Sequence, residues 1–450
     1  MRPEHSNNLN SFLFSTAEMS GVFSAKARLR GMMCFEWALT CALEKHGLAQ
    51  MGSGAVIEGM LDADFIDIDS LMRDARRNGN VAIPFIRQLT AAVKARSEAA
   101  ARTVHHGATS QDVLDTALTL EMREALQLLE SAIARFEDAL IRQIETHAET
   151  VLASRTWLQA GPPTTLGLKL AGTLAAVRRS RTRLRAVAEK VLVLQFGGAV
   201  GTRAALGEKG GRVAAELARL LELGNPELPW HTQRDNLVEA VQMLGLLTGT
   251  LAKFARDIAL LMQSEVSEVF EGEGGGSSTM PHKHNAVACA AVLAVHTTMP
   301  GLAATMLAGM PQEHERGLGL WQAEWETVPE AFRRAAAALA SSIEIAEGLE
   351  VDAARMQANL DALLGLPMAE AVSVALTAKI GKTKAHEILG EASGRAQREH
   401  AHLSTILKRM PEVKEHLSDE EVDRLLDPRR YLGSAREFIA HILGGADADC

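Results

Sequence analysis

The sequence predicts an all-α protein in which a central bundle of very long up-and-down helices carries a smaller helical segment at each end. Proline, which interrupts helices, is absent from four long stretches of the 450 residues. Within these stretches apolar residues recur every three or four positions, as they do in a helix with one buried face. Alternating β-branched residues are scarce, so we expect little strand. The proline-free stretches are Phe85 to Gly161, Thr164 to Asn225, Trp230 to Met280 and Glu330 to Leu366.

Three segments follow from this pattern. Residues 1–103 mix shorter helical patterns with Asp-rich and Gly-containing turns, which predicts an N-terminal helical domain. Residues 104–359 hold the long periodic stretches and form the predicted bundle. Residues 360–450 return to short helices and turns, and they are expected to form a C-terminal helical domain.

The first long helix of the bundle shows the clearest stripe. Its apolar residues step by three or four, with Glu, Arg and Gln between them, at Leu126, Leu129, Ile133, Phe136, Leu140 and Ile144. Leu166 to Leu194 and Asn236 to Phe270 show similar patterns rich in Ala and Leu. Several stripes are broader than one contact within a chain needs, so we expect the bundles of different subunits to associate.

Charge and cysteine usage narrow the class of protein. The chain has 47 Lys and Arg against 56 Asp and Glu, with no basic run that would neutralise a nucleic-acid backbone. Its four cysteines have no CxxC spacing, and Cys34 and Cys41 are predicted core thiols in a reducing compartment. We find neither a secretory signal nor an uninterrupted apolar run of about twenty residues. The prediction is a cytoplasmic protein that binds neither nucleic acid nor membrane.

The most informative stretch is Gly274-Gly-Gly-Ser-Ser-Thr-Met-Pro-His-Lys-His-Asn285. Three glycines let the backbone swing, and apolar helical segments flank them at Leu251 to Phe270 and Val287 to Ala294. This is typical of a lid that closes over an anion. Ser277 or Ser278 is a candidate general base if Lys283 and backbone N–H groups stabilise its alkoxide.

A second motif, His105-His-Gly-Ala-Thr-Ser-Gln-Asp112, precedes the first long helix. Thr109, Ser110 and Asp112 are good helix-start residues, and capping alone would account for them. Hydroxyls and free N–H groups at a helix N-terminus also bind carboxylates. The third motif is Arg155-Thr-Trp-Leu-Gln-Ala-Gly-Pro-Pro-Thr-Thr-Leu-Gly167, which is expected to open the second long helix.

These three motifs resemble those of the fumarase/aspartase superfamily: GSSxMPxKxNP, HxGxTSxD and GRTHxQxAxPxTLG. In the lid, Ala286 replaces the usual Pro. The resemblance implies that Ser277 abstracts or delivers a proton and that the substrate is a small poly-carboxylate. It also implies a homotetramer in which three subunits meet at each active site, and no cofactor. No metal is expected either, because there is no HExxH motif and few acidic residues lie near the lid histidines. Implied binding residues are Thr109, Ser110, Gln159, Gln233, Lys283, Asn285 and Arg316, the last from a PQEHER element.

One departure from the superfamily pattern carries chemical information. Trp157 stands where many members have a His that handles the proton of the leaving group. Loss of water or an amine needs an acid, whereas a carboxylate, with a conjugate-acid pKa of about 4, can depart unprotonated. Trp157 is therefore expected to line the substrate pocket or the core, and lactone formation fits its presence. His105 is the reserve candidate for proton handling.

The whole chain resembles the bacterial lactone-forming cycloisomerases of this superfamily, for example in QFGGAVGTRAALG, PWHTQRD and LLDPRRYLGSA. This implies interconversion of 3-carboxy-cis,cis-muconate and 4-carboxymuconolactone in protocatechuate degradation. Three alternatives remain open: a 3-sulfomuconate cycloisomerase, an adenylosuccinate lyase and a non-catalytic structural homologue. His284, where we expect Arg, and Arg203, beside GGAVGT, favour the first of these alternatives, because either residue can retune an anion pocket.

Overall fold

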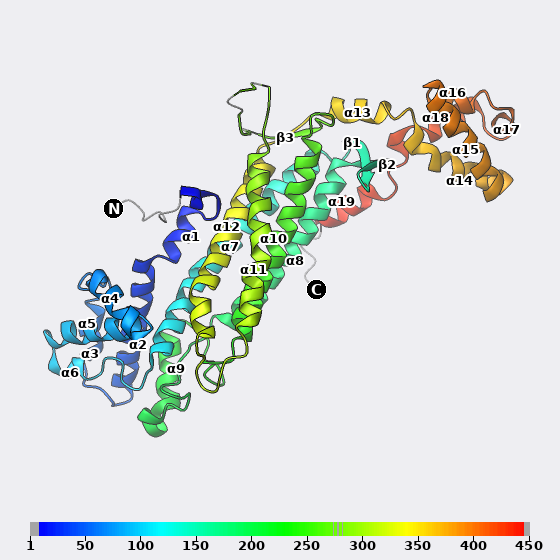
Figure 1. Ribbon diagram of the computed structural model, residues 1–450. Coiled ribbons are helices and arrows are strands. Elements are labelled where there is room, and N and C mark those ends of the chain that lie inside the picture. The colour runs from blue at the N-terminus through cyan, green and yellow to red at the C-terminus, as the bar shows by residue number, and fades with distance from the viewer. Residues whose placement is uncertain (1–8, 273, 277–278, 281, 445–450) are drawn as a thin grey trace. The chain divides into compact units, whose positions relative to one another are not determined.

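Five long helices occupy the middle of the chain (Figure 1). The computed structural model describes residues 9–272, 274–276, 279–280 and 282–444. The long helices are α7 (Ser110–Thr146), α8 (Leu166–Val191), α10 (Asp235–Leu261), α11 (Val287–Ala308) and α12 (Leu320–Glu347). The predicted all-α class is confirmed, and all six apolar positions of the predicted stripe in α7 are buried.

The chain divides into two compact units, and each of the five long helices contributes residues to both. The first unit contains the described residues up to Ile133 together with Ser180–Gly249 and Ala294–Ala340. The second contains Ala134–Arg179, Thr250–Leu293 and the described residues from Ser341 onward. The predicted division into residues 1–103, 104–359 and 360–450 follows the sequence pattern and stays a prediction.

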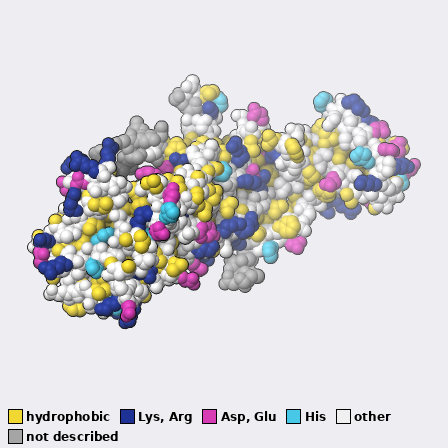
Figure 2. All heavy atoms as spheres, turned by 60° about the horizontal axis from the view of Figure 1, so that its bottom comes forward, with side chains coloured by type: hydrophobic (Ala, Val, Ile, Leu, Met, Phe, Trp, Pro, Cys, Tyr) yellow, Lys and Arg dark blue, Asp and Glu magenta, His cyan; other side chains and the backbone are white. Residues whose placement is uncertain are grey.

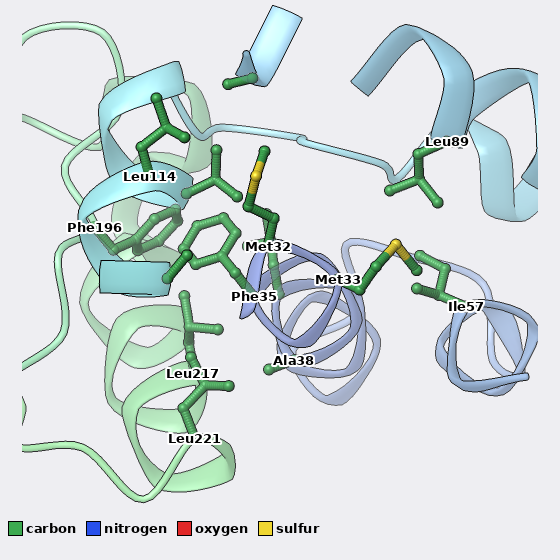
Figure 3. Close-up of a cluster of buried hydrophobic side chains, with 14 of the residues drawn as sticks. Met32, Met33, Phe35, Ala38, Ile57, Leu89, Leu114, Phe196, Leu217 and Leu221 are labelled. Atoms are coloured by element: carbon green, nitrogen blue, oxygen red, sulfur yellow. The ribbon is translucent and has the colours of Figure 1, made fainter. Parts of the chain in front are cut away.

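Helix α2 lies at the centre of the core of the first unit. Figure 3 shows Met33 of α2 facing Ile57 and Leu89, while Phe35 meets Phe196 with ring centroids 6.3 Å apart. Besides parts of the long helices, this unit contains η1 (Leu9–Leu13), α1 (Ala17–Val22), α2 (Ala25–Lys45), α3 (Ser53–Glu58), α4 (Ile68–Asn78), α5 (Ala82–Lys94), α6 (Glu98–Ala101), η2 (Ala204–Lys209) and α9 (Gly210–Leu220).

The second unit ends in a group of short helices with its own apolar core, which includes Val372, Leu389 and Leu407. It also holds two two-stranded antiparallel sheets, β1 (Val151–Thr156) with β2 (Gln159–Thr165) and β3 (Val269–Glu271) with β4 (Leu349–Val351). Its short helices are α13 (Ala353–Asp361), η3 (Leu366–Met368), α14 (Ala369–Ile380), α15 (Lys382–Glu399), α16 (Leu403–Leu407), α17 (Pro411–Lys414), α18 (Asp419–Leu425), η4 (Pro428–Arg430) and α19 (Ala435–Gly444).

One expectation for a helix end was wrong. Helix α10 ends at Leu261 instead of Phe270, and a turn that includes Ser267, with φ 49°, leads from it into strand β3. The last long helix begins at Leu320 and includes Pro329, so it does not coincide with the proline-free stretch after Glu330. Pro329 has no backbone N–H, so the helix lacks one hydrogen bond there, and a long packed helix tolerates this loss.

The segment expected to open the second long helix forms the β1–β2 hairpin instead. Its two-residue turn is Trp157-Leu158, with φ of 54° and 62°, so both residues occupy the left-handed region typical of a type I′ turn. Helix α8 begins only at Leu166, after the two prolines of β2. Cys34 and Cys41, predicted as core thiols, are half-buried free cysteines, and burial raises the pKa of Cys41 to about 11.

Among the described residues two single helices, α10 and α11, are long and apolar enough to span a membrane by length and composition. The most apolar 18-residue stretch of α10 is 61% buried, whereas that of α11 is only 33% buried. On the face in view in Figure 2, Lys and Arg side chains are interspersed with Asp and Glu. Helix α11 therefore presents apolar surface that needs an explanation.

Candidate active site

The motif HGATSQD forms the turn that leads into α7, whose first residue is Ser110. The carboxylate of Asp112 accepts a hydrogen bond from the backbone N–H of Thr109 at 3.1 Å, as expected for a helix-start residue. Thr109 and Ser110 are half-buried, so their hydroxyls lie near the surface of the first unit. The free N–H groups of this helix end provide a partial positive charge.

Asp112 connects this turn with two other motifs. Its fully buried carboxylate also accepts hydrogen bonds from Gly197 N at 2.9 Å, Gly198 N at 2.8 Å and His231 Nε2 at 2.7 Å. Four donors saturate one buried charge, which removes most of its desolvation cost. The sequence indicated only a cap at this position, and the partners lie more than eighty residues away.

Glycine is required where the GGAVGT loop meets the turn. A Cβ atom on Gly198, whose φ is 70°, would lie 2.8 Å from the carbonyl oxygen of Gly107. A Cβ on Gly197 would lie 2.8 Å from His231 Cε1. The two loops therefore approach each other at backbone distance.

Arg316 of the PQEHER element completes a cationic site beside Thr109. Its Nη1 donates to Thr109 Oγ1 at 3.3 Å, and its Nη2 donates to the carbonyl of Ala199 at 2.9 Å. The hydroxyl of Thr232 holds the carbonyl of His314 at 2.9 Å. We use the name anion corner for Thr109, Ser110, Arg316 and the N-terminus of α7.

A buried ionic network supports the loops around the anion corner. Arg234, whose side chain is 1% exposed, donates to Asp115 Oδ2 at 2.7 Å and to Glu324 Oε2 at 2.5 Å. Trp321 Nε1 donates to Asp115 at 3.0 Å, and Gln312 Nε2 donates to Glu324 at 2.9 Å. Burial raises the pKa of Glu324 although Arg234 opposes the shift. No pattern in the sequence predicted this network.

Gln233 lies next to Arg234 in the same loop, and its side chain is exposed. His105 is half-buried and has φ 58°. Its Nδ1 lies 2.7 Å from an oxygen of Glu36, which is fully buried. Four of the predicted site residues, Thr109, Ser110, Gln233 and Arg316, thus belong to linked loops of the first unit, and His105 lies one turn before Thr109.

The other predicted site residues that the structure describes belong to the second unit. Trp157 is 98% exposed at the tip of the hairpin, so it is not a core residue of the single chain, and its place in a substrate pocket stays a prediction. A two-residue hairpin turn projects its side chains away from the strands, and Gln159 is exposed beside it. Arg155, two residues before the turn, binds Glu268 with two hydrogen bonds of 2.7 and 2.9 Å.

Backbone hydrogen bonds close the base of the predicted lid. Gly275 and Asn285 exchange backbone hydrogen bonds of 3.0 and 2.8 Å, which bring the two ends of the loop together. Glu271 accepts from the N–H groups of Ala288 and Cys289 at the start of α11. Lys283 is exposed. Ser277 and Ser278 lie outside the described residues.

The fold and these motif loops define an all-α lyase. A family model described as "Lyase" matches residues 13–301, and one described as "Adenylosuccinate lyase C-terminus" matches residues 365–442. The chain belongs to this lyase family, the fumarase/aspartase superfamily that its motifs resemble.

Individual relatives show which enzymes of this family the chain is similar to. The chain is 50% identical to a 3-carboxy-cis,cis-muconate cycloisomerase of Pseudomonas aeruginosa, over 97% of this chain and 96% of the relative. It is 40% identical to one of Acinetobacter baylyi, over 98% and 99%. The crystal structure of 3-carboxy-cis,cis-muconate lactonizing enzyme from Pseudomonas putida superposes with a TM-score of 0.93 at 48% identity, covering 97% of this chain and 98% of that one.

Proposed function

We propose that this protein is a cycloisomerase that interconverts 3-carboxy-cis,cis-muconate and 4-carboxymuconolactone. The observation that supports this most strongly is its identity of 40 to 50% with cycloisomerases of that name over nearly the full length of both chains. The anion corner fits a poly-carboxylate substrate, because it combines a guanidinium, hydroxyls and the positive end of a long helix.

The chemistry of the reaction agrees with the residues present. One carboxylate of the substrate adds to an alkene carbon of the same molecule, which leaves a carbanion stabilised as an aci-carboxylate on the neighbouring carbon. Ser277 delivers a proton to that carbon, and the reverse reaction removes it. The internal carboxylate needs no proton to leave, so a Trp in place of the usual acid at position 157 is compatible with turnover.

Residue roles form part of the same proposal. Lys283, Asn285, Gln233 and Arg316, together with Thr109 and Ser110, bind the substrate carboxylates and stabilise the charge that develops on the intermediate. Gln159 and Trp157 border the same pocket from the hairpin of another subunit. The exposed, left-handed tip of the hairpin supports this assignment, since an apolar turn of this kind is unfavourable unless it is covered.

The direct test is parallel turnover of 3-carboxymuconate, 3-sulfomuconate and adenylosuccinate, followed by absorbance and by NMR of the products. We expect rapid loss of the muconate absorbance and a lactone as the product. A preference for the sulfonate, or release of AMP from adenylosuccinate, would favour one of the alternative enzymes. Inactivity of the intact chain toward all three substrates would favour the non-catalytic homologue.

The variant Trp157→His tests the leaving-group argument. We expect it to gain no strong adenylosuccinate or fumarate lyase activity, because one imidazole does not supply the remainder of either site. The measurement is the initial rate with each substrate, and Leu158→His at the neighbouring turn position is the control. Strong lyase activity in the parent, which has no His at this position, would contradict the leaving-group argument. Strong lyase activity in Trp157→His alone would show that this single residue decides the leaving group and that the rest of the site already accepts the lyase substrate.

We also propose a homotetramer with shared active sites. Helix α11 contains no Asp, Glu, Lys or Arg, yet only 33% of its most apolar stretch is buried, and Leu307 is 52% exposed. Packing of this helix against other subunits would bury that surface. The cytoplasmic location and the absence of a membrane partner belong to the same proposal, since the subunit interface accounts for the apolar helix.

Light scattering at micromolar concentration tests the assembly. We expect the mass of four chains without detergent. A monomer would contradict the tetramer, and a requirement for detergent would indicate that α11 contacts a membrane instead.

A further inference from the structure

The carboxylate of Glu36 is fully buried, and within the described part of the chain its hydrogen bonds all go to one residue. It lies on α2, and both of its oxygens bind His105: Oε1 lies 2.7 Å from the ring Nδ1, and Oε2 accepts from the backbone N–H at 2.7 Å. Burying a charge is costly unless it is paired and hydrogen-bonded. The pairing fixes the imidazole and its backbone at the same time.

The conformation of His105 indicates that the contact positions the ring. Its φ of 58° is unfavourable for a residue with a Cβ, so the surrounding structure must hold it there. Because Nδ1 is committed to Glu36, Nε2 is the remaining ring nitrogen, and it has no hydrogen-bond partner in the described part of the chain. The side chain is 19% exposed, so a small ligand can reach it.

The Glu36–His105 pair is connected to the segments that form the anion corner. His105 accepts the backbone N–H of Ala108 at 3.2 Å, which places the ring-bearing residue one turn before Thr109. On the other side, Phe35 packs on Phe196, the residue before the Gly197 loop (Figure 3). Helix α2 approaches α7 closely, since a Cβ on Gly31 would lie 3.1 Å from that of Ala117.

The charges around the ring favour its protonated form. Burial disfavours an imidazolium, but Glu36, in direct contact, and Asp112 of α7 attract it and raise the pKa of His105 above its ordinary value. An imidazolium with Nδ1–H on Glu36 presents Nε2–H as a charged hydrogen-bond donor.

We propose that Glu36 is a positioning residue for the reaction, and that it orients His105 so that Nε2–H donates a charged hydrogen bond to a carboxylate of the substrate. The inference rests on the proposed function and assigns His105 to substrate binding instead of proton transfer. No bond to His105 forms or breaks, and its proton stays on the ring throughout turnover.

The variant Glu36→Gln is the test, and Glu121→Gln is its matched control. Glu121 is also a buried carboxylate, on α7, and it pairs with Arg28 of α2 at 2.6 Å, about 13 Å along the helix from Asp112. We expect kcat/KM of Glu36→Gln to fall by about 10- to 100-fold, mainly through KM, as for loss of a charged hydrogen bond. Glu121→Gln should retain kcat/KM within about twofold, whatever its loss of stability.

The pH profile provides a readout that a merely structural pair would not affect. Because substrate binding needs the imidazolium, kcat/KM of the parent should fall as the pH rises through the pKa of His105. In Glu36→Gln the main attraction is lost, so this fall should move to lower pH. In His105→Asn it should disappear, and adding Glu36→Gln to His105→Asn should change kcat/KM no further.

Hydrogen–deuterium exchange at histidine Cε1, followed by mass spectrometry, measures the pKa of His105 without substrate. We expect a lower pKa in Glu36→Gln than in the parent or in Glu121→Gln. An unchanged pKa, wild-type kcat/KM in Glu36→Gln, or a full Glu36→Gln effect in the His105→Asn background would each overturn the inference. If the parent does not turn over carboxymuconate, the proposed function fails instead, and the exchange result still reports on the pair.

Discussion

Replacing Ser277 by Ala is expected to lower kcat for lactone formation by about 10²- to 10⁴-fold, the usual contribution of a positioned acid or base. The alkene carbon must gain a proton after the carboxylate adds, and in the proposed chemistry only the Ser277 hydroxyl delivers it. Substrate carboxylates are bound by other residues, so KM should change little. Steady-state kinetics with carboxymuconate measure both quantities.

Two other lid variants make this result specific. Ser278→Ala separates the two hydroxyls, and we expect it to retain much more activity than Ser277→Ala. His282→Asn changes an exposed lid residue and should remain close to the parent. If Ser278→Ala lost as much kcat as Ser277→Ala, or if Ser277→Ala turned over like the parent, Ser277 would not be the proton donor.

Replacing Arg234 by Met is expected to lower the free energy of unfolding by about 3–5 kcal/mol, the usual cost of removing one partner from a buried ionic group. Arg234 is the shared partner of Asp115 and Glu324, which are both buried, so its loss leaves two carboxylates facing each other without a cation. Activity should fall as well, because the adjacent Gln233 and the loop of Arg316 depend on this network. Chemical denaturation measures the change in stability.

The destabilisation should depend on pH in a defined direction. Burial already raises the pKa of Glu324, and removing Arg234 raises it further, so the folded state holds this proton more tightly than the unfolded state does. Stability of Arg234→Met should therefore fall as the pH rises above the unfolded carboxyl pKa of about 4. The deficit relative to the parent should be smallest in acid.

An exposed ion pair supplies the control for Arg234. Arg135, 65% exposed, binds Glu347 through two hydrogen bonds of 2.7 and 2.8 Å, yet Arg135→Met should have nearly parental stability because solvent screens the pair. Restoring neutrality with Asp115→Asn and Glu324→Gln in the Arg234→Met background should recover part of the loss. Equal stability of Arg234→Met and the parent at neutral pH would contradict the role given to the network.

Local patterns predicted much of this protein. The apolar spacing of residues 126–144 in α7 indicated both the helix and its buried face, because helix geometry converts a spacing of three or four directly into one side of a cylinder. Motifs indicated the superfamily, Thr109 and Ser110 at a helix start, and Ser277 in a glycine-rich loop. Each of these inferences needs only residues that are close together in the chain.

The interactions that organise the site join residues far apart in the chain, and the sequence pattern does not predict them. The carboxylate of Asp112 meets Gly197, Gly198 and His231, and Glu36 meets His105 across 69 residues of sequence. The Trp157 turn was missed for a different reason, since a hairpin turn made of Trp and Leu lacks the Asn-Gly signal typical of a type I′ turn.

The sequence by itself therefore determined the all-α class, the long helices and the lyase superfamily, and it predicted the type of substrate, because helix periodicity and short motifs are properties of neighbouring residues. Only the tertiary structure decided that Arg234 is buried between two carboxylates, that Asp112 joins three loops, and that Glu36 binds His105. Which charges are buried, and which partners stabilise them, depends on the packing of distant segments, and burial sets the energetic value of every charge in this site.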